Sequence, residues 1–290
     1  MTGASSGIGR SAALAFASCG AKVACVARRQ DLLDSLVQEI KSKYSVDALA
    51  IPADLSSNVY ETAKAAVEKA TSSLGPIDIL INNAGHHALS KFVDHDPFST
   101  WSDIVTFGLT VPPAFCHAVL PSMIDRKQGS VLLNVNSTVG ARDKGPSMTA
   151  YAVAKAGMIR FFQNLPAELQ GTGIVCYSVH PGNIWTDMVK GSFKKLEQEF
   201  GEFKFASHRC SVTNHLRAGE EAAQGIRNGL KWQTVEQAAN SIVTICADER
   251  FKMMDGRWIN GEQDLEQILK VAESGRVEKE KLYCLKVDEL

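Results

Sequence analysis

Thr2-Gly3-Ala4-Ser5-Ser6-Gly7-Ile8-Gly9 is a glycine-rich turn that runs into a helical pattern. Gly3 permits the tight turn, Gly7 lets the backbone approach a ligand, and Gly9 lets the following helix pack closely. The N-terminus of a helix offers free N–H groups and the positive end of the helix dipole. The stretch therefore predicts a site for phosphate groups.

Short runs rich in β-branched residues alternate with longer helical patterns along the rest of the chain. The runs are apolar throughout, which is typical of parallel strands that helices cover on both faces. The pattern predicts an α/β fold, a doubly wound parallel sheet of the Rossmann type in three layers, α/β/α. We expect strands at residues 21–27, 48–53, 77–81, 130–135, 174–180 and 257–259, and helices at residues 7–19, 31–42, 58–74, 100–125, 151–170 and 234–247.

The same pattern predicts one domain over residues 1–261. Over residues 193–231 the pattern weakens into charged residues with lone aromatics, and an insert after a late strand usually covers the ligand crevice. Residues 262–290 form a charged, helix-prone extension, which we expect to pack on the edge of the domain or to be exposed. The aromatics of the insert and its end, which either line an apolar pocket or serve plain packing, are Phe193, Phe200, Phe203, Phe205 and Trp232.

Composition narrows the classes of function. The net charge is −1 and the isoelectric point is about 6.7, so no basic field draws the chain to nucleic acid or to an acidic membrane surface. The seven cysteines are scattered without a C-x-x-C pair, which favours reduced thiols over a disulfide or zinc framework and predicts no metal site. We expect a cytoplasmic protein without a membrane span that acts on a small molecule.

Tyr151 and Lys155 stand four residues apart in an expected helix, so both side chains project from one face. A phenol with an ordinary pKa of about 10 is a poor base near neutrality. An ammonium beside it favours the phenolate and lowers the pKa of the phenol. The pair therefore indicates proton transfer at Tyr151.

Three further motifs follow expected strands: Asp54-Leu55, Asn82-Asn83-Ala84-Gly85, and Pro181-Gly182 with Thr186. In order and spacing, these motifs, the TGxxxGxG turn and the Tyr-x-x-x-Lys pair resemble the short-chain dehydrogenase/reductase (SDR) family over residues 2–261. The closing strand and charged tail are similar to those of fungal members of its compact, single-domain branch. The resemblance implies an NAD(P)-binding catalytic domain. Its cofactor-binding residues are then Gly3, Ser5, Ser6, Gly7, Ile8, Gly9, Asp54, Leu55, Asn83, Ala84, Gly85, Tyr151, Lys155, Pro181, Gly182, Ile184 and Thr186.

The choice of cofactor depends on the end of the strand at residues 21–27. A carboxylate there binds the ribose hydroxyls of NAD(H), but this chain has Ala27. Arg28 and Arg29 follow, and a guanidinium suits the 2′-phosphate of NADP(H). The alternative is that both arginines are solvated charges at the start of a helix, where the dipole does not favour them. The charge pattern favours NADP(H) over NAD(H), with Arg28 and Arg29 as cofactor-binding residues.

A third catalytic group must polarise the substrate oxygen. The family places a serine thirteen residues before the tyrosine, which reaches Thr138, whereas residue type favours its neighbour Ser137. Adjacent side chains on a strand end point to opposite faces, so only one of them serves without a bulge. Spacing slightly favours Thr138, and both residues stay candidates.

Two departures from the family pattern bear on activity. The strand that leads into the glycine turn is absent ahead of Thr2, so we expect the first strand to be truncated. Gly108 takes the place of a catalytic asparagine, whose carbonyl holds a relay water in the family. Pro112 has no N–H, so it would leave the carbonyl of Gly108 without a helical partner. Gly108 is therefore a candidate catalytic residue, and a degenerate helix is the alternative.

Prolines also bear on assembly. Pro112 and Pro113 lie in the long expected helix and Pro166 lies in the next one, and interior prolines kink helices. Members of the family often pair through these helix faces. A homodimer and a homotetramer are both expected forms, and neither is favoured.

The leading hypothesis is an NADP(H)-dependent oxidoreductase of secondary metabolism. It would move a hydride between the nicotinamide and a carbonyl or secondary alcohol of a small, apolar metabolite. The rival hypothesis is a catalytically silent NADP(H)-binding scaffold or sensor, which Gly108, the Thr138 ambiguity and the missing strand support. The intact Tyr151 and Lys155 favour the enzyme.

Overall fold

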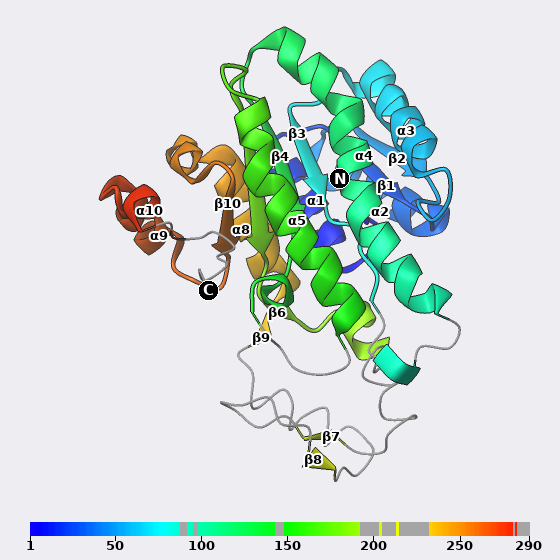
Figure 1. Ribbon diagram of the computed structural model, residues 1–290. Coiled ribbons are helices and arrows are strands. Elements are labelled where there is room, and N and C mark those ends of the chain that lie inside the picture. Colours follow the sequence, from blue (N-terminus) through cyan, green and yellow to red (C-terminus); the bar gives the residue numbers. More distant parts are fainter. Residues whose placement is uncertain are drawn as a thin grey trace.

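The computed structural model of this chain describes residues 1–87, 92–94, 98–142, 148–191, 203–204, 213–214, 232–280 and 282. Parallel strands form a central layer with helices on both faces (Figure 1), so the predicted α/β class is confirmed. The expected strands and helices are present, each end within two residues of its expected position. The segment at residues 193–231 lies mostly outside the described residues.

The elements in chain order are α1 (Gly7–Ser18), β1 (Val23–Ala27), α2 (Gln30–Tyr44), β2 (Ala48–Pro52), α3 (Val59–Leu74), β3 (Ile79–Asn82), η1 (Phe92–Asp94), α4 (Ser99–Arg126), β4 (Ser130–Val135), η2 (Thr138–Gly140), α5 (Thr149–Glu168), β5 (Ile174–His180), β6 (Asn183–Ile184), β7 (Phe203–Lys204), β8 (Thr213–Asn214), β9 (Trp232–Gln233), α8 (Val235–Ala247), η3 (Glu249–Met254), β10 (Arg257–Asn260), α9 (Leu265–Glu273) and α10 (Arg276–Lys279).

The main sheet has two parallel parts, β2-β1 and β3-β4-β5-β10. The first two residues of the chain lie between them. The amino group of Met1 donates to the carbonyl of Ala24 at 3.0 Å, and the N–H of Val26 donates to the carbonyl of Met1 at 2.9 Å. On the other side, the N–H of Thr2 donates to the carbonyl of Ile81 at 3.0 Å. Met1 and Thr2 therefore stand where the end of the strand before the glycine turn is expected.

Side chains alternate between the two faces of the sheet, as the period of a strand requires. On β4, Leu132 packs with α3, α4 and α5, whereas Leu133 packs with α1, α2 and α8. On β5, Cys176 and Tyr177 divide in the same way. The core thus consists of two apolar clusters, one on each face. The described cysteines are free thiols, as expected: Cys19, Cys25, Cys116, Cys176 and Cys246.

Helix α4 covers the whole range expected for it. It continues through Pro112 and Pro113 to Arg126, and it is apolar enough in its 28 residues to cross a membrane by length and composition. Core helices can have the same length and composition. Helix α4 packs between α3 and α5 (Figure 1), with Phe115 and Val119 buried against the sheet. This is the position of a core helix.

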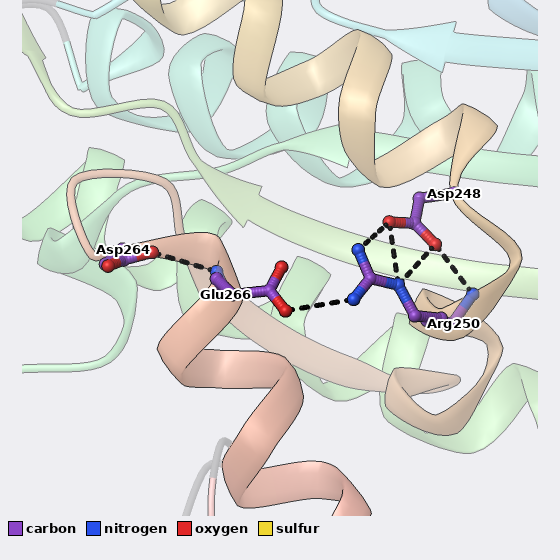
Figure 2. A network of polar contacts seen from close by, with 4 residues as sticks. All are labelled: Asp248, Arg250, Asp264 and Glu266. Atoms are coloured by element: carbon purple, nitrogen blue, oxygen red, sulfur yellow. Dashed lines mark hydrogen bonds and ion pairs between the residues drawn. The ribbon is translucent and has the colours of Figure 1, made fainter.

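The first part of the C-terminal extension packs on the edge of the sheet. Helix α9 buries Ile268 and Leu269 in the same cluster as η3. Figure 2 shows the polar contacts that accompany this packing. The guanidinium of Arg250 donates to Asp248 at 2.7 Å and to Glu266 on α9 at 3.0 Å, and the carboxylate of Asp264 accepts from the N–H of Glu266 at 2.9 Å.

Candidate active site

A cleft of about 1190 Å³ opens at the carboxyl ends of the parallel strands. Ligands of doubly wound sheets bind at this edge. Gly9 and Gly108 stand outside the wall of the cleft, whereas the other residues predicted to bind the cofactor or to act in catalysis line it. Those in the wall are Gly3, Ser5, Ser6, Gly7, Ile8, Arg28, Arg29, Asp54, Leu55, Asn83, Ala84, Gly85, Ser137, Thr138, Tyr151, Lys155, Pro181, Gly182, Ile184 and Thr186.

Close backbone contacts shape the glycine turn. A Cβ at Gly9 would lie 2.3 Å from the carbonyl oxygen of Gly3 and 2.5 Å from Nδ2 of Asn83. The Asn83 amide donates to the carbonyls of Thr2 and Gly3 at 3.0 and 3.2 Å, so it joins the turn to the loop after β3. Gly7 has φ +55°, and a Cβ there would meet Thr186 across the cleft at 3.3 Å. The turn therefore keeps an open cradle at the start of α1, which suits phosphate groups.

Two arginines and a carboxylate stand near this cradle. The guanidinium of Arg29 donates to the hydroxyls of Ser5 and Ser6 at 3.0 and 2.8 Å. Asp54 accepts from the N–H and the hydroxyl of Ser56 at 3.0 and 2.8 Å. These two bonds, and then the nearby charge of Arg28, hold the pKa of Asp54 below its ordinary value. The strand end between these groups is Ala27, so no carboxylate stands there.

Tyr151 and Lys155 face the cleft from one side of α5. The Lys155 ammonium lies 5.4 Å from the centroid of the Tyr151 ring and donates to the carbonyl of Val135 at 2.8 Å. Burial raises the pKa of Tyr151 to about 12, and a hydrogen bond with Ser137 opposes this effect. Burial lowers the pKa of Lys155 to about 8. The phenol is therefore protonated near neutrality, and the expected lowering of its pKa by Lys155 is wrong because burial outweighs it.

The hydroxyl that contacts Tyr151 belongs to Ser137. The spacing-based preference for Thr138 is not supported by this contact, because Thr138 begins the short helix η2 whereas Ser137 is its N-cap. The side-chain amide of Asn136, which follows β4, links this strand end to α5 and β5. Its Nδ2 donates to the carbonyl of Lys155 at 3.2 Å and to the hydroxyl of Ser178 at 2.9 Å. Sequence reasoning gave Asn136 no role.

Gly108 serves the packing of α4 against α5. A Cβ there would lie 2.7 Å from Cβ of Ala154, the residue before Lys155. The carbonyl of Pro112 accepts a long bond of 3.5 Å from the amide of Asn82. The contact with Ala154 explains a glycine at residue 108 without a catalytic role, and the relay through Gly108 stays a prediction.

The loop from Pro181 to Thr186, called here the proline loop, is held by side chains from far along the sequence. Glu262 accepts from the N–H and the side-chain amide of Asn183 at 3.1 and 2.9 Å. A Cβ at Gly182 would lie 2.3 Å from Oε1 of Gln233. Strand β6 of this loop pairs in parallel with β9, which carries Gln233. Sequence reasoning missed Glu262 and Gln233, because neither belongs to a local motif.

Two histidines were also missed, although they directly follow the Asn82–Gly85 motif. The ring of His87 lies over that of Tyr151, with 5.0 Å between centroids and 56° between planes. His86 contacts Phe107 edge to face at 6.3 Å. Burial, then the charges of His86 and Lys155, lower the pKa of His87 to about 4. Within the described ranges no cluster of histidine, cysteine and carboxylate side chains could hold a metal ion.

Comparison with known proteins gives consistent matches. The family model described as short chain dehydrogenase matches residues 1–197. A short chain dehydrogenase of Pseudocercospora fijiensis is 37% identical over 291 residues, which cover 99% of this chain and 88% of that protein. A 3-oxoacyl-[acyl-carrier-protein] reductase of Staphylococcus aureus is 32% identical over 203 residues, or 69% of this chain and 79% of that protein. The solved structure of a 7α-hydroxysteroid dehydrogenase with NADH and 7-oxo glycochenodeoxycholic acid aligns with a TM-score of 0.70 at 25% identity, covering 89% of this chain and 90% of the other.

Proposed function

The chain belongs to the short-chain dehydrogenase family, and we propose that it is an NADP(H)-dependent oxidoreductase acting on a carbonyl or secondary alcohol of a small, apolar metabolite. The observation that carries this proposal is the convergence of Tyr151, Lys155 and Ser137 in one cleft with the phosphate cradle of the glycine turn. We further propose a cytoplasmic location, in keeping with the net charge of −1.

The proposed chemistry divides between cofactor and protein. The nicotinamide, when bound, supplies or accepts the hydride. Tyr151 holds a proton near neutrality, so it donates that proton to the substrate oxygen during reduction. Ser137, hydrogen-bonded to the same phenol, polarises the substrate carbonyl and orients it. Lys155 places its ammonium beside the Tyr151 ring, where it stabilises the phenolate left behind.

Three features support NADP(H) over NAD(H). The strand end offers Ala27 in place of a carboxylate that would repel a 2′-phosphate. Arg29 is held at the rim of the cradle by Ser5 and Ser6, and a guanidinium forks well onto phosphate oxygens. Arg28 lines the same part of the cleft. These positive groups are the proposed 2′-phosphate site.

Cofactor binding and turnover test the proposal together. The protein is titrated with NADPH and NADH by thermal shift, and NADPH oxidation is followed by absorbance with a panel of ketones and aldehydes. We expect a larger shift with NADPH and measurable oxidation with at least one carbonyl. Arg29→Ala should weaken NADPH binding about tenfold and change NADH binding little. A thermal shift without turnover on any carbonyl would identify a scaffold or sensor, and equal losses with both cofactors would remove the 2′-phosphate assignment.

A further inference from the structure

Asn136 directly follows β4, and its side-chain amide forms hydrogen bonds on both sides of the proposed proton-transfer group. Its Nδ2 donates to the carbonyl of Lys155 at 3.2 Å and to the hydroxyl of Ser178 on β5 at 2.9 Å. Its Oδ1 accepts from the N–H of Ser137 at 2.7 Å. The residue is 3% exposed, and its own N–H extends the pairing with β5 by donating to the carbonyl of Val179 at 2.7 Å. A buried, bonded amide therefore joins the segment that carries Ser137 to the helix that carries Lys155.

Two further contacts from the same segment fix Lys155. The ammonium Nζ donates to the carbonyl of Val135 at 2.8 Å. A Cβ on Gly140, which ends η2, would lie 2.6 Å from the carbonyl carbon of Lys155, so η2 approaches the backbone of α5 closely at this point. The short segment of residues 135–140 thus contacts Lys155 at its ammonium, its carbonyl and its backbone. The same segment contains Ser137, whose hydroxyl contacts Tyr151.

A second buried asparagine shows what is particular to Asn136. Asn134, two residues earlier on β4, is 2% exposed, and residues two apart along a strand point to the same face of the sheet. Within the described residues, Nδ2 of Asn134 has no hydrogen-bond partner. A buried amide contributes to stability only through the bonds that it makes, because its desolvation is unfavourable. The two asparagines therefore match in residue type, strand, face and burial, and differ in their bonds to Lys155 and Ser137.

We propose that Asn136 is a positioning residue, which holds the Ser137 hydroxyl and the Lys155 ammonium at a fixed separation around Tyr151. This inference rests on the proposed function and adds a residue that acts through Ser137 and Lys155. Without the amide, α5 loses its side-chain link to the end of β4, and the two groups can move relative to each other. A misplacement of about 1 Å in a catalytic group can lower the rate by about 100-fold.

Paired asparagine variants test this role. We measure kcat with NADPH and cyclohexanone, or with whichever carbonyl of the panel the wild type reduces fastest, and the free energy of unfolding by urea denaturation. Asn136→Leu should lower kcat about tenfold, because the Ser137 and Lys155 groups are no longer held together. Asn134→Leu is the matched control and should leave kcat within about twofold of the wild type, because its Nδ2 bonds neither group. Equal losses of kcat in the two variants, or a value within twofold of the wild type in Asn136→Leu, would overturn the positioning role.

A double-mutant cycle separates positioning from general support of the fold. If Asn136 acts through Ser137, adding Asn136→Leu to Ser137→Ala should lower kcat by about threefold or less, against about tenfold in the wild-type background. Equal factors in both backgrounds would mean that Asn136 supports the fold and does not position Ser137. A wild type that reduces no carbonyl of the panel overturns the proposed function, and this role with it. An NADPH-induced thermal shift verifies each variant, and Asn136→Ala replaces Asn136→Leu if the leucine variant shows no shift.

Discussion

The two ends of the cleft are built in different ways. At the glycine turn, the shape depends on backbone approaching backbone, since a Cβ at Gly9 would lie 2.3 Å from the carbonyl oxygen of Gly3. At the proline loop, the shape depends on side chains, since Glu262 binds Asn183 across 79 residues of sequence. A shape held by backbone leaves a local signature of glycines, whereas a shape held by side chains can use residues from anywhere in the chain.

The largest expected effect on turnover comes from a substitution that changes neither the glycine turn nor the proline loop. Tyr151→Phe removes the proton donor while the ring keeps its contacts with His87 and Lys155. We expect turnover to fall by about 100-fold to 10,000-fold, because general acid catalysis contributes that much. Steady-state kinetics, with NADPH affinity measured alongside, checks this. Loss of NADPH binding would mean that Tyr151 also supports the shape of the cleft.

Variants of Ser137 and Thr138, measured by the same steady-state kinetics, show which of the two hydroxyls polarises the substrate. Ser137→Ala should approach the deficit of Tyr151→Phe, because its hydroxyl contacts the phenol. Thr138→Val should be mild. A severe Thr138→Val with a mild Ser137→Ala would return the polarising role to Thr138.

The next largest effect is expected from a substitution in the glycine turn, the end of the cleft that backbone contacts hold. Gly9→Ala places a methyl group where the carbonyl of Gly3 and the amide of Asn83 already stand, and neither can move without opening the turn. We expect a loss of about 3 kcal/mol in the free energy of unfolding and loss of the NADPH-induced thermal shift. Gly191→Ala is the control, because no atom of the described residues lies within 4 Å of a Cβ there. A Gly9→Ala protein that binds NADPH normally would contradict the backbone-held description of this end.

The smallest effect tests the end that is held by side chains. Glu262→Leu removes the acceptor for both N–H groups of Asn183, so we expect the KM for NADPH to rise about threefold to tenfold with kcat little changed. Glu262→Gln keeps the amide oxygen as acceptor and should recover most of the affinity. Glu266→Leu, on α9, is the matched control, because Glu266 contacts Arg250 outside the cleft. Equal losses in the Leu and Gln variants would show that the negative charge, and not the hydrogen bonds, matters at this position.

Local sequence patterns were enough to predict the layers of the fold and many of the residues that line the cleft. The strand at 130–135 has its exact expected bounds, because its residues are apolar on both faces and turn residues flank it. The residues that follow such strands must meet at one edge of a parallel sheet, which is why Asp54, Asn83 and Pro181 could be placed together from their motifs.

Other features depend on distances that no local pattern contains. The thirteen-residue spacing before Tyr151 favoured Thr138 as the polarising residue, but the turn into η2 presents the hydroxyl of Ser137 to Tyr151. Gly108 suggested altered chemistry, whereas its closest neighbour is Ala154 on the facing helix. Glu262 looked like the start of a charged tail, yet it supports the proline loop. In each case the deciding contact joins residues from separate elements.

The pairing of β6 with β9 has an evolutionary consequence. Ile184 and Gln233 are partners in one short parallel ladder, so the two chain positions on either side of residues 185–231 are held next to each other. The cost of closing such an excursion grows slowly with its length, so insertions and deletions within it disturb the rest of the molecule little. Natural variation, or grafting from a relative, can therefore change the sequence and length of residues 193–231, beyond Thr186, while Ser137, Tyr151 and Lys155 are inherited unchanged.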